Sequence, residues 1–195
     1  MLNATAQDVD YYTHENGVLK LGNKVSSSNS LGSLGTAIYA IHYIELYTDG
    51  ETSEYILRVD LESGLGFPYL FPADARMLMK VNKETLELVP IFHCHHEYSD
   101  SSHPLLMGMP VFKSQAFYRL PKEQLESICQ QGSTKIRIEI LAYNNKDGIH
   151  MTHRDMQLNT KNIKKFVDES SKNTEAAFNR INYKQPERKD ISKKF

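Results

Sequence analysis

The chain has 195 residues, with 23 Lys and Arg against 24 Asp and Glu, so its formal net charge is −1. This balance argues against a protein that binds nucleic acid or a membrane over its whole surface, because such proteins usually carry a net basic footprint. The hydrophobic content of 40% is ordinary for one globular domain, and the apolar runs are too short for a transmembrane helix of about 20 residues.

Alternation of apolar and polar residues predicts β-strands through the first three quarters of the chain. Residues 36–47 are apolar on both strand faces, which is typical of a central strand covered on both sides. The turn dipeptide Asp49-Gly50 predicts a hairpin between this segment and a cleaner alternating strand over 53–61. The same period predicts four further strands, over 75–81, 85–98, 111–120 and 135–142.

Three polar segments are expected to be loops because they lack apolar periodicity. They are the Ser- and Gly-rich residues 22–35, the Ser- and Asp-rich residues 99–104, and residues 145–158. The last of these could supply further polar ligands only by folding back onto a strand, which the sequence does not decide.

Two helices are predicted. Pro121 begins the first, over 121–131, at a position where a missing backbone N–H costs nothing, and Gly132 follows its end. Residues 161–181 carry apolar residues at helical spacing and predict a long amphipathic helix, followed by a mobile polar tail over 182–195.

These elements predict an α+β fold in a single domain over residues 1–181. We expect one antiparallel sheet of about six strands, strongly twisted or partly closed, covered on one face by the two helices. If the long helix packs on the sheet, Phe166 and Phe178 should be buried beneath it.

Residues 75–140 resemble small uncharacterised bacterial proteins in the order and spacing of their motifs. Residues 75–81 and 86–88 match an "LLIKL…IEL" hairpin, residues 118–128 match a helix that reads "YxLxxEQLxxL", and residues 135–139 match a strand that reads "KIRIE". The turn Gly expected after Lys80 is missing. The resemblance implies a β-rich fold without any transferable activity, and it favours an exported or envelope-associated protein over a cytoplasmic one. Ala4-Thr5-Ala6 has the form of a signal-peptidase site, but no apolar segment precedes it.

An aromatic surface on the first hairpin is the candidate ligand-binding site. Tyr39, Tyr43 and Tyr47 fall on one face of the strand predicted over 36–47, and His42 falls on the opposite, apolar face. Core packing explains most of these residues, whereas a platform for peptide or carbohydrate is the more specific alternative.

The run His93-Cys94-His95-His96 is the most conspicuous constellation of metal-ligand types, with His103 nearby. His93 and His95 would share a strand face, but a metal ion needs at least a third ligand. We therefore expect no bound metal and no cofactor. With only two cysteines, the chain has no disulfide framework, and neither lies in a CxxC motif.

The chain has no phosphate-binding Gly-rich loop, no G-x-S-x-G elbow, no HExxH motif and no EF-hand loop. The sequence therefore leaves three hypotheses. The first is a non-catalytic binding or structural module whose partner is most plausibly another macromolecule, nucleic acid not being predicted. The second is a small-molecule carrier with a cavity between sheet and C-terminal helix, and the third is a metal-dependent enzyme that uses His93 and His95.

Overall fold

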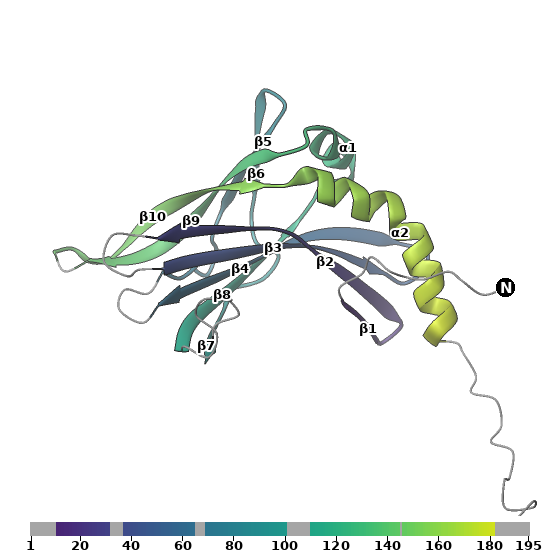
Figure 1. The fold of residues 1–195 in the computed structure, drawn as a ribbon, viewed down its shortest axis with the longest axis horizontal. Helices are drawn as coiled ribbons and strands as arrows, with labels where there is room; N and C mark the ends of the chain where they lie inside the picture. Colours follow the sequence, from purple (N-terminus) through teal and green to yellow (C-terminus); the bar gives the residue numbers. More distant parts are fainter. Residues whose placement is uncertain (1–10, 32–36, 65–68, 101–109, 145, 182–195) are drawn as a thin grey trace, which may run out of the picture.

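The structure is a computed structural model. It describes residues 11–31, 37–64, 69–100, 110–144 and 146–181. The ten strands of these residues form two antiparallel sheets, and two helices complete the fold (Figure 1). Both sheets and both helices contribute side chains to one hydrophobic cluster. The fold is thus mostly β, with a C-terminal helix, within the predicted α+β class.

Sheet A has six strands in the order β1-β2-β3-β4-β8-β7, all antiparallel. It is curled, and its edge strands bend away from the other sheet (Figure 1). Its strands are β1 (Tyr11–Glu15), β2 (Val18–Leu31), β3 (Ala37–Thr48), β4 (Ser53–Gly64), β7 (His95–Asp100) and β8 (Pro110–Arg119).

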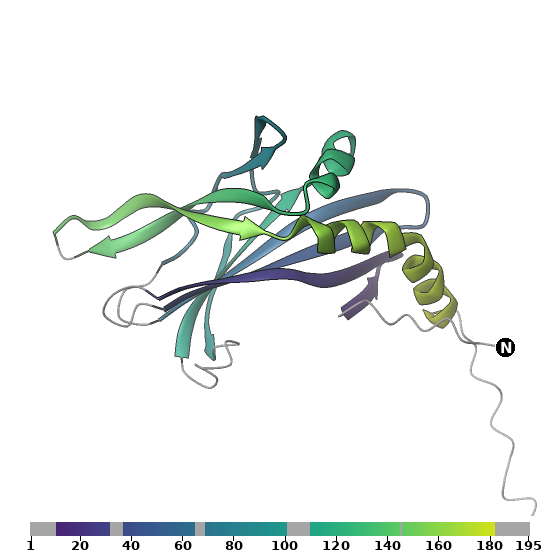
Figure 2. The same cartoon turned by 45° about the horizontal axis from the view of Figure 1, so that its top comes forward.

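Sheet B has four strands in the order β10-β9-β5-β6, and it lies against the apolar face of sheet A (Figure 2). Tyr118 of β8 spans the interface, since its hydroxyl donates a hydrogen bond to the carbonyl of Ala75 at 2.9 Å. The strands of sheet B are β5 (Met77–Val81), β6 (Glu84–Leu88), β9 (Thr134–Asn144) and β10 (Gly148–Leu158).

The two helices match their predicted ranges closely. Helix α1 (Lys122–Gln130) follows Pro121, and Gly132 beyond its end has a φ of +77°, a conformation that glycine adopts without strain. Helix α2 (Thr160–Ile181) packs on the apolar face of β2 and β3. Phe166 is buried beneath α2, and Phe178 is half-buried against the same cluster, which confirms the predicted packing of this helix.

The predicted single sheet of about six strands was incomplete. Residues 22–31, expected to belong to a loop over 22–35, lie in β2, and residues 148–158, expected to be a polar loop, form β10. Both segments are polar, and each is held as a strand by pairing along nearly its full length with a more apolar neighbour, β3 or β9.

The predicted strand over 85–98 was also wrong, because it is two strands in different sheets. The chain leaves sheet B after Leu88, passes Pro90, and joins the edge of sheet A at His95. Proline has no amide hydrogen for a sheet ladder, so a change of direction there has a physical cause. Residues 32–35, 101–104 and 182–195 of the predicted loops and tail lie outside the described residues.

Candidate functional site

Three of the four candidate ligand residues lie on the polar face of sheet A, which is turned away from sheet B. Tyr39, Tyr43 and Tyr47 alternate along β3 and therefore project from the same face. The register places Tyr43 opposite Arg58 of β4, whose guanidinium carbon lies 4.0 Å from the centroid of the Tyr43 ring. This distance indicates a cation–π contact.

Glu45 is the centre of an ion-pair cluster on this polar face, although its side chain is 0% exposed. Arg58 Nη1 lies 2.9 Å from one carboxylate oxygen, and Lys20 Nζ lies 3.1 Å from the other. The hydroxyl of Tyr47 donates a hydrogen bond to the second oxygen at 2.9 Å. The cluster thus satisfies a carboxylate whose burial without partners would be strongly unfavourable.

Asp60 extends the cluster along β4. Its Oδ1 atom lies 3.0 Å from Arg58 Nε and accepts a hydrogen bond of 3.2 Å from the side-chain amide of Gln115. Burial raises the pKa of Asp60 to about 6, and the neighbouring Arg58 partly opposes this rise. Two cations, Lys20 and Arg58, meet two carboxylates, Glu45 and Asp60, so their formal charges cancel. Such a balanced cluster favours stabilisation of the sheet over recognition of a charged ligand.

His42 does not join the tyrosines, because it projects from the opposite face of β3 into the core. It is fully buried, its Nδ1 lies 3.0 Å from the hydroxyl of Ser26, and no hydrogen bond reaches its Nε2. Burial lowers the pKa of His42 to about 4. The four residues of the candidate site therefore divide between two faces, and His42 is placed as a buried core histidine.

The His-rich segment does not assemble a metal site within the described residues. His93 and His95 are both exposed, whereas Cys94 between them is buried and its amide donates to the carbonyl of Ala73 at 3.1 Å. His96 contacts the hydroxyl of Ser114 through its Nδ1 at 3.0 Å. No group of three His, Cys, Asp or Glu side chains in the described ranges is arranged to hold a metal ion, and His103 lies outside those ranges.

A second surface, which we call the arm, is formed by the far end of the β9–β10 hairpin. The hairpin extends past the rest of the ribbon at one end of the molecule (Figures 1 and 2). Tyr143 and Ile149 face each other across the two strands, and Met151 follows Ile149 on the same outward face. Their exposed fractions are 43%, 73% and 54% respectively. The arm thus presents three large apolar side chains to solvent.

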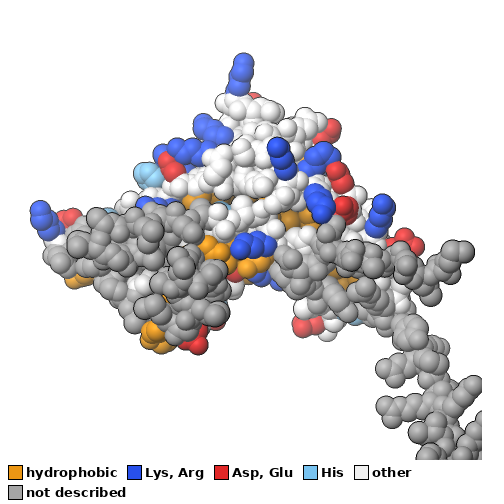
Figure 3. Space-filling view, in the orientation of Figure 1, with side chains coloured by type: hydrophobic (Ala, Val, Ile, Leu, Met, Phe, Trp, Pro, Cys, Tyr) orange, Lys and Arg blue, Asp and Glu red, His pale blue; other side chains and the backbone are white. Residues whose placement is uncertain are grey.

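The outward face of sheet B changes character between the arm and the base of β9. From Leu141 toward the start of β9, this face carries Glu139 and then Arg137, which lies opposite Asp155 of β10. Arg137 donates two hydrogen bonds to Asp155, at 2.6 and 3.0 Å, and this contact lowers the pKa of the Asp155 carboxyl. Figure 3 shows side chains of both charge signs over the part of the surface formed by sheet B and the helices.

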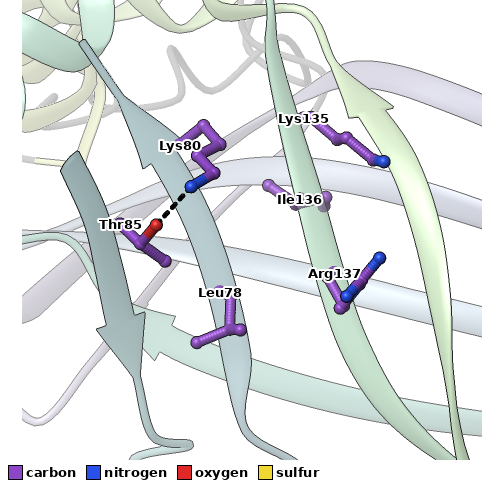
Figure 4. Close-up of a pocket in the computed structure, with 6 residues that line it drawn as sticks. All are labelled: Leu78, Lys80, Thr85, Lys135, Ile136 and Arg137. Atoms are coloured by element: carbon purple, nitrogen blue, oxygen red, sulfur yellow. Dashed lines mark hydrogen bonds between the residues drawn. The ribbon is translucent and has the colours of Figure 1, made fainter. Parts of the chain in front are cut away.

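A pocket of about 200 Å³ opens on this outward face where β5 and β9 separate (Figure 4). The two strands pair from Met77 to Met79 only, and the opening lies at the end of this paired stretch, where Leu78 is opposite Arg137. The residues that line it are Leu78, Lys80, Thr85, Lys135, Ile136 and Arg137.

Sequence reasoning missed the arm because it placed 145–158 in a loop, and it missed the pocket because the pairing of β5 with β9 was not predicted. Two signals for the arm were nevertheless present. Asp147-Gly148 is a hairpin turn dipeptide, and Ile149, Met151 and His153 alternate with polar residues directly after it.

No protein-family model matches the chain, no curated protein matches it, and no solved structure matches it. Across the described residues, neither helix combines the length and the apolar character that crossing a membrane requires.

Proposed function

We propose that this protein is a non-catalytic binding module that recognises another protein through the arm. The observation that carries the proposal is the exposure of Tyr143, Ile149 and Met151, side by side on the outward face of a hairpin that projects from the fold. Clustered apolar side chains of this size on a surface typically mark an interaction site.

Core formation does not account for these side chains. On the inward face of the same hairpin, Ile140 is fully buried and Ala142 is nearly so. The β9 residues on either side of each are half-buried or exposed. The alternation of β9 therefore already supplies its core-facing residues. The outward apolar residues are additional, and burying them needs a surface from outside the described fold.

The backbone of the arm offers a second means of recognition. β10 is the last strand in the order of sheet B, so its outer edge pairs with no other strand among the described residues. An unpaired edge next to exposed apolar side chains is the arrangement used when a partner protein adds a strand to a sheet.

The proposal can be tested by site-specific photocrosslinking in cells that produce the protein. A photoreactive phenylalanine analogue at Ile149 should give one dominant adduct with a partner protein, identified by mass spectrometry. The matched control places the same analogue at Lys172, an exposed position on α2. The same adducts at both positions, or none at Ile149, would contradict a binding role for the arm.

A further inference from the structure

The pocket beside β9 combines an apolar floor with a cationic rim. Leu78 supplies the accessible apolar part of the lining, because Ile136 is fully buried, and the lining includes three cations but no carboxylate. Lys80 points toward β6, where its Nζ donates to the hydroxyl of Thr85 at 2.5 Å (Figure 4). Lys135 and Arg137 point toward β10 on the other side of the opening (Figure 4). A ligand between them would have positive charge on both sides.

The charge around the opening is not balanced. Lys135 and Arg137 share a single carboxylate, Asp155, at 2.7 and 2.6 Å. Among the described residues, Lys80 forms no ion pair. Arg76 and its two carboxylates, Glu139 and the Glu87 that lies opposite Leu78, complete the surroundings, so four cations face three carboxylates and one positive charge is in surplus. The surplus favours an anionic group.

The positive charge is concentrated at one end of the pocket. At the other end, Arg76 meets two carboxylates, Glu139 at 2.5 Å and Glu87 at 3.4 Å, and Glu87 lies directly opposite Leu78. An anionic group would therefore be attracted to the end of the opening that carries Lys80 and Lys135, away from Glu87. Lys135 is 57% exposed, so its flexible chain can turn toward a ligand without disturbing the core.

The position of the pocket relates it to the arm. Arg137 at the pocket and Tyr143 on the arm lie on the same outward face of β9, six residues apart, which corresponds to about 20 Å of strand. An extended peptide of about seven residues covers that distance. A partner that contacts both places would need apolar side chains at one end and carboxylates beside an apolar side chain at the other.

We propose that this pocket binds an acidic, extended segment of the partner protein, with one apolar side chain over Leu78 and a neighbouring carboxylate between Lys80 and Lys135. This inference names the partner's chemistry and rests on the proposed function of the arm. Its basis is the coincidence of an apolar opening, a surplus of positive charge and continuity with the arm along one strand.

The test uses the full chain labelled with ¹⁵N and two short probe peptides, Ac-Leu-Asp-Leu-Asp-NH2 and its neutral counterpart Ac-Leu-Asn-Leu-Asn-NH2. The acidic peptide should shift the backbone amide signals of Leu78, Lys80, Ile136 and Arg137, with a Kd on the order of 1 mM, as expected for a small contact. The neutral peptide should bind at least about fivefold more weakly. Raising NaCl from 0.05 to 0.5 M should weaken the acidic peptide, because salt screens exposed charges.

The decisive variant is Lys80→Gln combined with Lys135→Gln, which should weaken the acidic peptide at least about fivefold. The control, Lys122→Gln with Lys172→Gln, removes the same charge from the exposed surfaces of the helices and should leave its Kd within about twofold. Equal binding of both peptides, equal loss in both double variants, or shifts confined to other residues would overturn the proposal. So would octanoate shifting the pocket signals where the acidic peptide does not, since the site would then take a free amphiphilic anion.

The two proposals fail separately. A protein that crosslinks a partner through position 149 but does not bind the acidic peptide contradicts only the pocket. A protein that binds the acidic peptide but gives no specific crosslink contradicts the proposed role of the arm.

Discussion

The guanidinium of Arg58 lies over the ring of Tyr43, 4.0 Å from its centroid, while its nitrogens contact two carboxylates. Three side chains from β3 and β4 thus meet at one cation on the polar face of sheet A. Because Glu45 is fully buried, its charge depends on Arg58 and Lys20 for compensation. The contact makes Arg58 a structural residue of the curled sheet.

Replacing Arg58 should destabilise the protein strongly. We expect Arg58→Met to lower the free energy of unfolding by about 3 kcal/mol, because it leaves Glu45 with a single cation in a buried site. The measurement is urea denaturation at pH 7. The matched control is Arg119→Met, which removes an exposed ion pair with Glu54 at 3.2 Å and should cost less than about 1 kcal/mol. Equal losses in the two variants would contradict the structural role of Arg58.

Asp60 should make stability fall as pH rises. Burial raises its pKa from the ordinary 3.8 to about 6 in the folded protein, so the folded state holds the proton more tightly. The contribution of protonated Asp60 to the free energy of unfolding is fully present below about pH 4 and is lost as the pH rises through 6. Relative to Asp60→Asn, the wild type should therefore lose about 2 to 3 kcal/mol between pH 4 and 7. Urea titrations at four pH values measure this difference, and a difference independent of pH would exclude the raised pKa.

His42 should have the opposite effect. Its pKa is lowered from 6.5 to about 4 in the folded protein, so the unfolded chain takes up a proton first as pH falls. The contribution of neutral His42 to the free energy of unfolding is fully present above pH 6.5 and is lost as the pH falls toward 4. Compared with His42→Gln, the wild type should lose about 3 kcal/mol between pH 7 and pH 4. An imidazole that titrates near 6.5 in NMR spectra of the folded protein would contradict its burial.

The parts of the fold that sequence could predict are those where local pattern and tertiary context agree. β3, β4 and β8 alternate clearly, and α1 and α2 have apolar faces at helical spacing. β2 could not be predicted in this way, because Ser26 to Ser30 are polar and their extended conformation comes from pairing with β3. The Asn16-Gly17 turn, with φ of 51° and 81°, was nevertheless a readable hairpin signal.

The candidate site shows a similar limit. Neighbouring residues of a strand point to opposite faces, so the sequence alone already placed His42 on the face opposite Tyr43. A single site that contains both residues was therefore inconsistent with a strand over 36–47. The contact of Tyr43 with Arg58 was also within reach, since the hairpin turn at Asp49-Gly50 sets the register that pairs them. Lys20 could not be added, because its strand was not predicted. The pocket could not be predicted, because it depends on how β5 and β9 separate, and no local sequence pattern determines this separation.

The arm should contribute little to stability if its apolar residues serve binding. Ile149→Ser combined with Met151→Ser should change the free energy of unfolding by no more than about 0.5 kcal/mol, because both side chains are already mostly exposed. Ile140→Ser, on the buried face of the same hairpin, should cost at least about 3 kcal/mol. Urea denaturation of the two variants beside the wild type gives both values.

The comparison separates two explanations for an apolar hairpin. If the arm variant is as destabilised as Ile140→Ser, Ile149 and Met151 support the fold, and their exposure says nothing about a partner. If the arm variant keeps its stability, any loss of binding follows from the missing apolar surface itself, because the β9–β10 pairing and the core beneath it are intact. A stable arm variant that still formed the wild-type complex would show that the partner is recognised elsewhere.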